Sequence, residues 1–156
     1  MAGSGVGLNW GGFDRRLMDI AKGLADHQAI LADVGEALVS STVQHFVEGK
    51  GPDGEDWKPS ERSARDGCKP LSDTGRLRQS IDYATAPDSV MVGTNAIYGR
   101  IHQLGGEIKP KNKKALKVKG RLVSKVTMPA RPYLYIDEED KAEVAHIIAL
   151  HTKGKR

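Results

Sequence analysis

The sequence predicts an α+β fold with N-terminal helices, a small antiparallel sheet that includes a long basic hairpin, and a C-terminal helix. Near both ends of the chain, apolar residues recur at the spacing of one helical face. In the middle they alternate with polar residues, as in half-buried strands. Turn sequences at Ala86-Pro87-Asp88 and Lys119-Gly120 separate the alternating runs, so the strands should pair as antiparallel hairpins.

Two helices are expected before residue 50. Apolar residues predict one helix over about residues 13–25 and a second over 29–48. Residues 1–12 lack this pattern and are expected to form a flexible arm, which leaves 13–156 as a single domain. Gly49-Lys50-Gly51 should end the second helix, because glycine readily adopts the left-handed conformation that often follows a helix.

The next segment is expected to be a loop anchored to the core. Gly51-Pro52-Asp53-Gly54 predicts a turn, because proline fixes φ, aspartate bonds its own backbone and glycine tolerates a positive φ. Trp57 should attach this loop to the core, since its large apolar ring gains free energy from burial. Residues 58–70 are polar and irregular, and we expect them to be the least ordered internal loop.

A short helix and a hairpin should follow. Ser72 or Asp73 can cap a helix that carries Leu77 on its apolar side. Residues 81–94 contain two alternating runs around a proline turn and predict a hairpin. Gly93, inside the second run, predicts a bulge or a close backbone contact.

The second hairpin is preceded by another short helix. Tyr98, Ile101 and Leu104 lie at helical spacing and predict a helix over about residues 96–104 that ends at Gly105. Residues 107–128 then read as extended segments on both sides of a turn, which predicts a long basic hairpin.

The chain should close with an extended segment and a helix. Pro129 and Pro132 hold the backbone extended around Arg131. Asp137 should cap the last helix, with Asp140 three residues on and acidic side chains throughout the first turn, where they complement the helix dipole.

The net charge of +4 is unevenly distributed along the chain. Residues 1–99 contain 10 basic and 14 acidic side chains, whereas residues 100–156 contain 14 basic and 6 acidic ones. Eight basic residues follow one another with no acidic residue between them: Lys109, Lys111, Lys113, Lys114, Lys117, Lys119, Arg121 and Lys125. Such a block attracts a phosphate backbone or an acidic protein surface.

Composition argues against several kinds of site. The single cysteine, Cys68, cannot form an internal disulfide and has no sequence context of a catalytic thiol. The five histidines lack the spacing of a catalytic zinc motif, so no metal ion or other cofactor is expected. A run of about 18 apolar residues is also missing, so no membrane partner is expected.

His102 is the one residue that could imitate a catalytic group. Paired with Asp73 or Asp53 it could act as an acid–base pair, but no nucleophile motif accompanies it. The alternative is that His102 and Gln103 bond nearby backbone at the end of a helix. We therefore expect a protein that is not an enzyme, and we keep a hydrolase that uses His102 as the weakest hypothesis.

The basic hairpin has three possible roles. It could be a solvated, mobile loop, a contact for DNA phosphates, or a contact for another protein. Lysine outnumbers arginine in it, and lysine is a point charge that does not read bases by paired hydrogen bonds. Any DNA contact should therefore be non-specific and sensitive to salt.

Five short motifs occur in an order that resembles the tailed-phage virion-morphogenesis (tail-completion) family, including its Mu-like group. Each motif is weak alone, but together they span about residues 46–136. They are Phe46 followed by Gly51-Pro52-Asp53-Gly54 and Trp57; Leu71-Ser72-Asp73-Thr74-Gly75 with Leu77 and Ser80-Ile81; Val92-Gly93-Thr94 with Tyr98; Ile101-His102-Gln103-Leu104-Gly105-Gly106; and Pro129-Ala130-Arg131-Pro132-Tyr133-Leu134. The chain departs from the pattern at Gly99, where alanine is expected, and at Leu104, where an aromatic residue is common.

The resemblance implies a non-enzymatic structural protein of the virion neck, made in the host cytoplasm. Such proteins form sixfold rings that complete the tail or join it to the filled head, next to other neck, connector and tail proteins. The basic hairpin would face a neighbouring subunit or the DNA in the bore. Structural roles would fall to the matching residues, which include Asp53, Trp57, Asp73, Thr74, Gly75, Tyr98, His102, Gln103, Gly105, Gly106, Arg131 and Pro132. The alternative is a small non-specific DNA-binding domain that uses the hairpin between Lys109 and Lys125.

Overall fold

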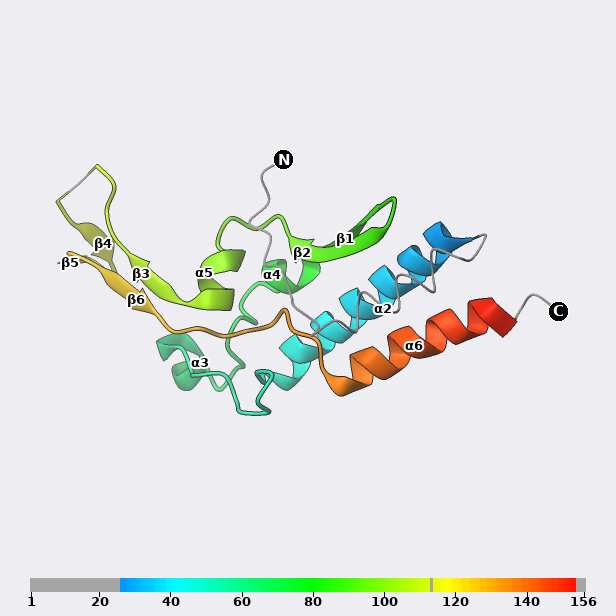
Figure 1. The fold of residues 1–156 in the computed structure, drawn as a ribbon. Coiled ribbons are helices and arrows are strands. Elements are labelled where there is room, and N and C mark those ends of the chain that lie inside the picture. Colours follow the sequence, from blue (N-terminus) through cyan, green and yellow to red (C-terminus); the bar gives the residue numbers. More distant parts are fainter. Residues whose placement is uncertain (1–25, 113, 154–156) are drawn as a thin grey trace.

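The computed structural model describes residues 26–112 and 114–153. The expected arm over residues 1–12 and the expected helix over 13–25 lie outside the described residues. The described residues form an α+β fold, as predicted, in which all the strands lie in the sequence between the two long helices α2 and α6 (Figure 1). In chain order the elements are α2 (His27–Glu48), α3 (Glu61–Asp66), α4 (Arg76–Gln79), β1 (Ile81–Ala86), β2 (Ser89–Thr94), α5 (Gly99–Leu104), β3 (Gly106–Ile108), β4 (Leu116–Val118), β5 (Arg121–Val123), β6 (Val126–Met128) and α6 (Glu138–Lys153).

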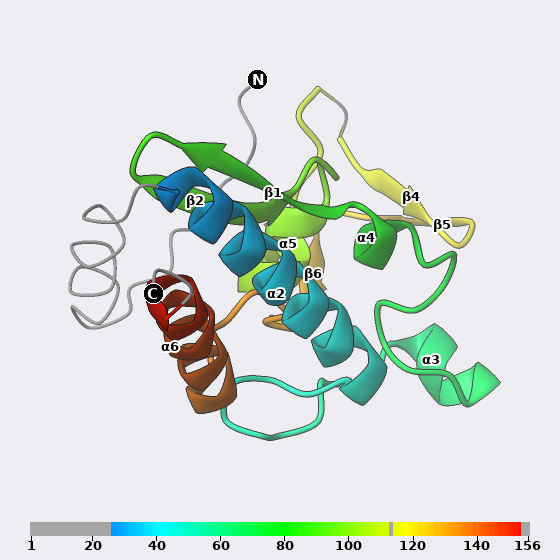
Figure 2. The same ribbon diagram turned by 90° about the vertical axis from the view of Figure 1, so that its right-hand side faces the viewer.

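Helix α2 is the centre of the fold and packs against both α6 and the β1–β2 hairpin. It begins at His27, two residues before the predicted start, and ends at Gly49, whose φ of 72° is left-handed as expected. Figure 2 shows α6 running antiparallel beside α2, with β1 and β2 crossing its other side. Near the start of α2 the core contains Ile30, Val34, Leu38, Val144, Ile147 and Ile148; near its end it contains Phe46, Trp57, Leu77, Ile81, Tyr133 and Leu134.

The loop predicted to be the least ordered contains a short helix, so that prediction was wrong. Helix α3 is held by a capping box in which the backbone N–H of Ser63 donates to Ser60 and the Ser63 hydroxyl accepts from the Ser60 backbone N–H. A serine at the third helical position is a weaker sequence signal than the usual glutamate or glutamine. The helix also has too few apolar residues to show a periodic pattern.

Two local predictions around α4 were also wrong. Neither Ser72 nor Asp73 caps this helix, because Gly75, with a φ of 72°, occupies the cap position. Thr74 provides the nearby hydrogen bond, in which its hydroxyl accepts from the backbone N–H of Arg76 over 3.3 Å. The β1–β2 hairpin forms as predicted, but Gly93 is neither at a bulge nor at a close contact: the register is continuous through it and its Cβ position is empty.

The long basic hairpin exists, but in two parts. Strand β3 pairs with β6 at its base, and β4 pairs with β5 at its tip. With β1–β2 this makes three separate two-stranded sheets. The hairpin projects from the body, away from the two long helices (Figure 1).

None of the described helices is both long and apolar enough to cross a membrane.

Candidate functional site

Several of the residues in the ordered motifs surround one extended segment. This segment, residues 129–136, connects β6 to α6 and is called the strap below (Figure 1). Its residues Tyr133 and Leu134 are buried, with 1% and 4% of their surface exposed. None of the described strands pairs with the strap, so its buried backbone groups need hydrogen-bond partners from side chains.

Gln103 supplies three of those partners. Its side-chain oxygen accepts from the backbone N–H groups of Tyr133 and Leu134, each over 2.9 Å. Its side-chain nitrogen donates to the Leu134 carbonyl over 2.8 Å. The prediction that Gln103 bonds backbone was therefore correct, although the backbone lies 30 residues along the chain and not nearby.

Trp57 and His45 hold the strap from the other side. The indole N–H of Trp57 donates to the Pro132 carbonyl over 2.9 Å, and Trp57 itself is buried as predicted. The Nδ1 atom of His45 lies 2.9 Å from the Tyr133 carbonyl and donates its proton to it. His45 was not selected from the sequence, because a lone histidine inside a helix gives no indication of a partner 88 residues away.

Arg131 is a buried residue of the core. It is 3% exposed, its backbone N–H donates to the His102 carbonyl over 2.7 Å, and its Nε donates to the Lys58 carbonyl over 2.7 Å. Burial lowers the pKa of Arg131. These bonds explain why an arginine stands between two prolines: it ties the strap to the loop that follows Trp57.

Two glycines let the strap approach α5. A Cβ atom at Gly105 would lie 2.7 Å from the Ala130 nitrogen and 2.9 Å from the Met128 oxygen, and its φ is 69°. A Cβ atom at Gly99 would lie 2.5 Å from Thr94 Cγ2 and 2.8 Å from the Tyr133 hydroxyl. The packing around Gly99 therefore leaves no room for the alanine that is expected at this position.

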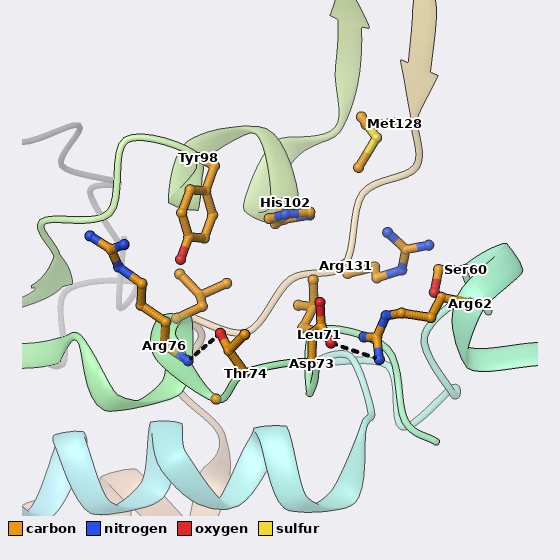
Figure 3. Close-up of a pocket in the computed structure, with 12 residues that line it drawn as sticks. Ser60, Arg62, Leu71, Asp73, Thr74, Arg76, Tyr98, His102, Met128 and Arg131 are labelled. Atoms are coloured by element: carbon orange, nitrogen blue, oxygen red, sulfur yellow. Dashed lines mark hydrogen bonds and ion pairs between the residues drawn. The ribbon is translucent and has the colours of Figure 1, made fainter. Parts of the chain in front are cut away.

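A cavity of about 360 Å³ brings together another group of the matching residues (Figure 3). Segments 73–75 and 98–102 line it together with the strap, and His102 lies between Tyr98 and Arg131. Tyr98 meets the His102 ring edge-on, with ring centroids 5.9 Å apart.

Among the described residues, neither Asp73 nor Asp53 forms a hydrogen bond or ion pair with His102, although Asp73 lines the same cavity. Asp73 forms an ion pair with Arg62 over 3.3 Å, and Asp53 accepts from the Glu55 backbone N–H in its exposed turn. Within residues 26–112 and 114–153, the buried Nδ1 of His102 has no hydrogen-bond partner, so the expectation that its side chain bonds backbone was wrong. Burial lowers the pKa of His102, and the charge of Arg131 lowers it further.

The basic side chains of the hairpin are exposed, apart from Lys113, which lies outside the described residues. Lys109 and Lys125 both form ion pairs with Glu107, and Lys119 forms one with Glu61. Four others have no ion pair with any described carboxylate: Lys111, Lys114, Lys117 and Arg121.

A second cavity, of about 430 Å³, lies between the end of α2 and the start of α6. We call it the acidic groove, because its carboxylates are Glu48, Asp137, Glu139, Asp140 and Glu143. From the sequence, the acidic side chains of α6 were expected only to complement the dipole of that helix. No pattern in the sequence indicated that Glu48 lies beside them.

One corner of the acidic groove contains donors of the kind that bind metals. Atoms of His45, Asp137 and Asp140 lie within 4.8 Å of one another. Both aspartates already have a structural role: each accepts the other's backbone N–H, over 2.8 and 3.1 Å, in the capping box predicted for α6. Histidine spacing in the sequence does not indicate this group, because its two carboxylates lie about 90 residues after His45.

Comparison with known proteins agrees with the resemblance seen in the ordered motifs. The model of the phage virion morphogenesis family matches residues 8–153. "Mu-like prophage FluMu G protein 2" of Haemophilus influenzae is 31% identical over 125 residues, which cover 80% of this chain and 78% of that protein. No solved structure matches the chain.

Proposed function

Because the chain belongs to the phage virion morphogenesis family, we propose that it is a structural protein of the virion neck. In this role it completes the tail or joins it to the filled head, as a homo-oligomeric ring of six copies. It carries out no catalytic step. The observation that best supports a ring is that the basic hairpin and the acidic groove lie at different places on the molecule.

A ring made from one kind of chain needs two different, complementary surfaces on every copy. The basic hairpin projects from one end of the molecule, and the acidic groove lies between the ends of the two long helices (Figures 1 and 2). Opposite charges of this kind orient subunits as they meet and favour one register. The likeness to a Mu-like prophage protein agrees with a place in a phage particle.

A tagged copy in phage particles tests the location. Gold-labelled antibody against the tag should mark the junction of head and tail. Particles from a phage that lacks the gene should contain filled heads and separate tails. Label along the whole tail, or absent from finished particles, would contradict a neck protein.

Non-specific DNA binding is the second candidate, favoured by the four hairpin cations that have no described ion pair. DNA titration at several salt concentrations tests it. Neutralising Lys113, Lys114 and Lys117 should weaken binding and flatten its dependence on salt. Equal affinity of the wild-type and neutralised proteins for DNA would remove this candidate.

A further inference from the structure

We propose that the tip of the basic hairpin on one copy docks into the acidic groove of a second copy. The inference rests on the proposed homo-oligomer and names the contact that would build it. Strands β4 and β5 would supply the docking side chains, and α2 and α6 of the neighbour would supply the receiving surface.

The tip carries apolar as well as basic side chains. Leu122 is 75% exposed and Val118 is 37% exposed. Lys117 lies opposite Leu122 in the ladder, and Arg121 lies opposite Val118, so each pair joins an aliphatic side chain to a cation. Contact with a protein surface removes exposed aliphatic side chains from water and so stabilises a complex, whereas a phosphate backbone provides little apolar surface for such contact. This pattern favours a protein surface over DNA as the partner.

The acidic groove has the complementary character. Glu48, Glu139 and Glu143 are exposed at its edge, and no ion pair with a described cation neutralises them. None of the described residues that line it is a lysine or arginine. Tyr135, which stacks on His45 of the groove, has its pKa raised to about 12, first by burial and then by carboxylates that include Asp137 and Glu48.

The hairpin tip and the acidic groove lie apart on one molecule. Strands β4 and β5 lie at one end of the molecule in Figure 1, whereas α6 begins near its middle, and in Figure 2 the two lie on opposite sides of α2. Contact between them must therefore join different copies, and each copy keeps one free hairpin and one free groove. Such head-to-tail contact repeats from subunit to subunit until a ring closes.

Charge reversal on both sides tests the contact. The hairpin variant carries Lys114→Glu, Lys117→Glu and Arg121→Glu, and the groove variant carries Glu48→Lys, Glu139→Lys and Glu143→Lys. Each should fail to assemble alone, with an apparent Kd for self-association raised at least about a hundredfold, because like charges then face each other. An equal mixture of the two should assemble again, since each supplies the partner that the other lacks.

A control variant with Lys58→Glu, Arg100→Glu and Lys153→Glu makes the same change in net charge as the hairpin variant, at exposed positions elsewhere, and should assemble like the wild type. Mass photometry measures assembly, and circular dichroism measures folding. Rescue in the mixture also separates the effect from misfolding. As a second measurement, Lys117→Cys and Glu139→Cys in a Cys68→Ser background should give linked multimers with a short bismaleimide.

The outcomes separate the proposals. Wild-type protein that stays monomeric, even with purified tails, would overturn both the docking and the ring. Rings that survive both reversals would overturn the docking alone. Variants that each fail to assemble, with no rescue on mixing, would exclude the acidic groove as the partner. A hairpin variant that loses DNA binding but still forms rings would show that the hairpin binds DNA and not the acidic groove.

Discussion

Replacing Gln103 should destabilise the fold more than any exposed substitution, because its amide alone satisfies three buried backbone groups. Gln103→Met keeps the size of the side chain, so it leaves no large cavity. It does remove the two hydrogen bonds from the backbone N–H groups of Tyr133 and Leu134, and the one to the Leu134 carbonyl. Each buried group without a partner costs about 1–3 kcal/mol, so the loss of three partners should lower the free energy of unfolding by at least about 3 kcal/mol.

Urea unfolding measures this loss. Fluorescence of Trp57, which bonds the same strap, reports the transition together with circular dichroism. Gln79→Met is the matched control, because Gln79 is exposed on α4 and should change the free energy by under about 0.5 kcal/mol. A Gln103→Met protein within about 1 kcal/mol of the wild type, with an unchanged dependence on urea, would refute the proposed role of Gln103 in the strap.

Three further predictions follow from the same region. Burial raises the pKa of Tyr133 to about 12 from an ordinary 10. The neutral hydroxyl therefore stabilises the folded state fully below pH 10. About 3 kcal/mol of the free energy of unfolding is lost as pH rises from 10 to 12. Tyr133→Phe should cost about 1 kcal/mol at pH 7 but make unfolding midpoints less steep above pH 10, and an equally steep profile would contradict this. Gly105→Ala should lower the free energy of unfolding by about 2–4 kcal/mol, because the added Cβ would meet the strap backbone. Gly120 has a similar φ but empty space around its Cβ position, so Gly120→Ala should cost about 1–2 kcal/mol. Equal losses would count against the contact at Gly105. Ser60→Ala should remove the cap of α3 and cost about 1 kcal/mol, and an unchanged melting curve would show that this helix does not need the cap.

Local patterns predicted the regular elements well. Helices α2 and α6 each bury one face, so their apolar spacing alone identifies them, and the turn between two alternating runs identifies the β1–β2 hairpin. Turn and cap residues act over a few positions, which is why Gly49 and Asp137 were recognised correctly. Helix α3 escaped because it is short, polar and capped by a serine pair.

The arrangement around the strap could not be predicted in the same way. Gln103 and His45 bond backbone that lies 30 and 88 residues away along the chain, and no spacing rule connects such positions. The ordered motifs include Trp57, Gln103 and Arg131, but only the structure shows that these residues bond the strap or its neighbouring loop. The acidic groove could not be predicted for a similar reason, since Glu48 lies far along the chain from its other carboxylates, which belong to residues 137–143.

Electron microscopy of purified protein and of phage particles tests the central claim most directly. We expect a sixfold ring from the purified chain and a matching ring at the junction of head and tail. In both, the hairpin of each copy should lie in the acidic groove of its neighbour. A protein that stays monomeric and is absent from the particles would contradict the neck role.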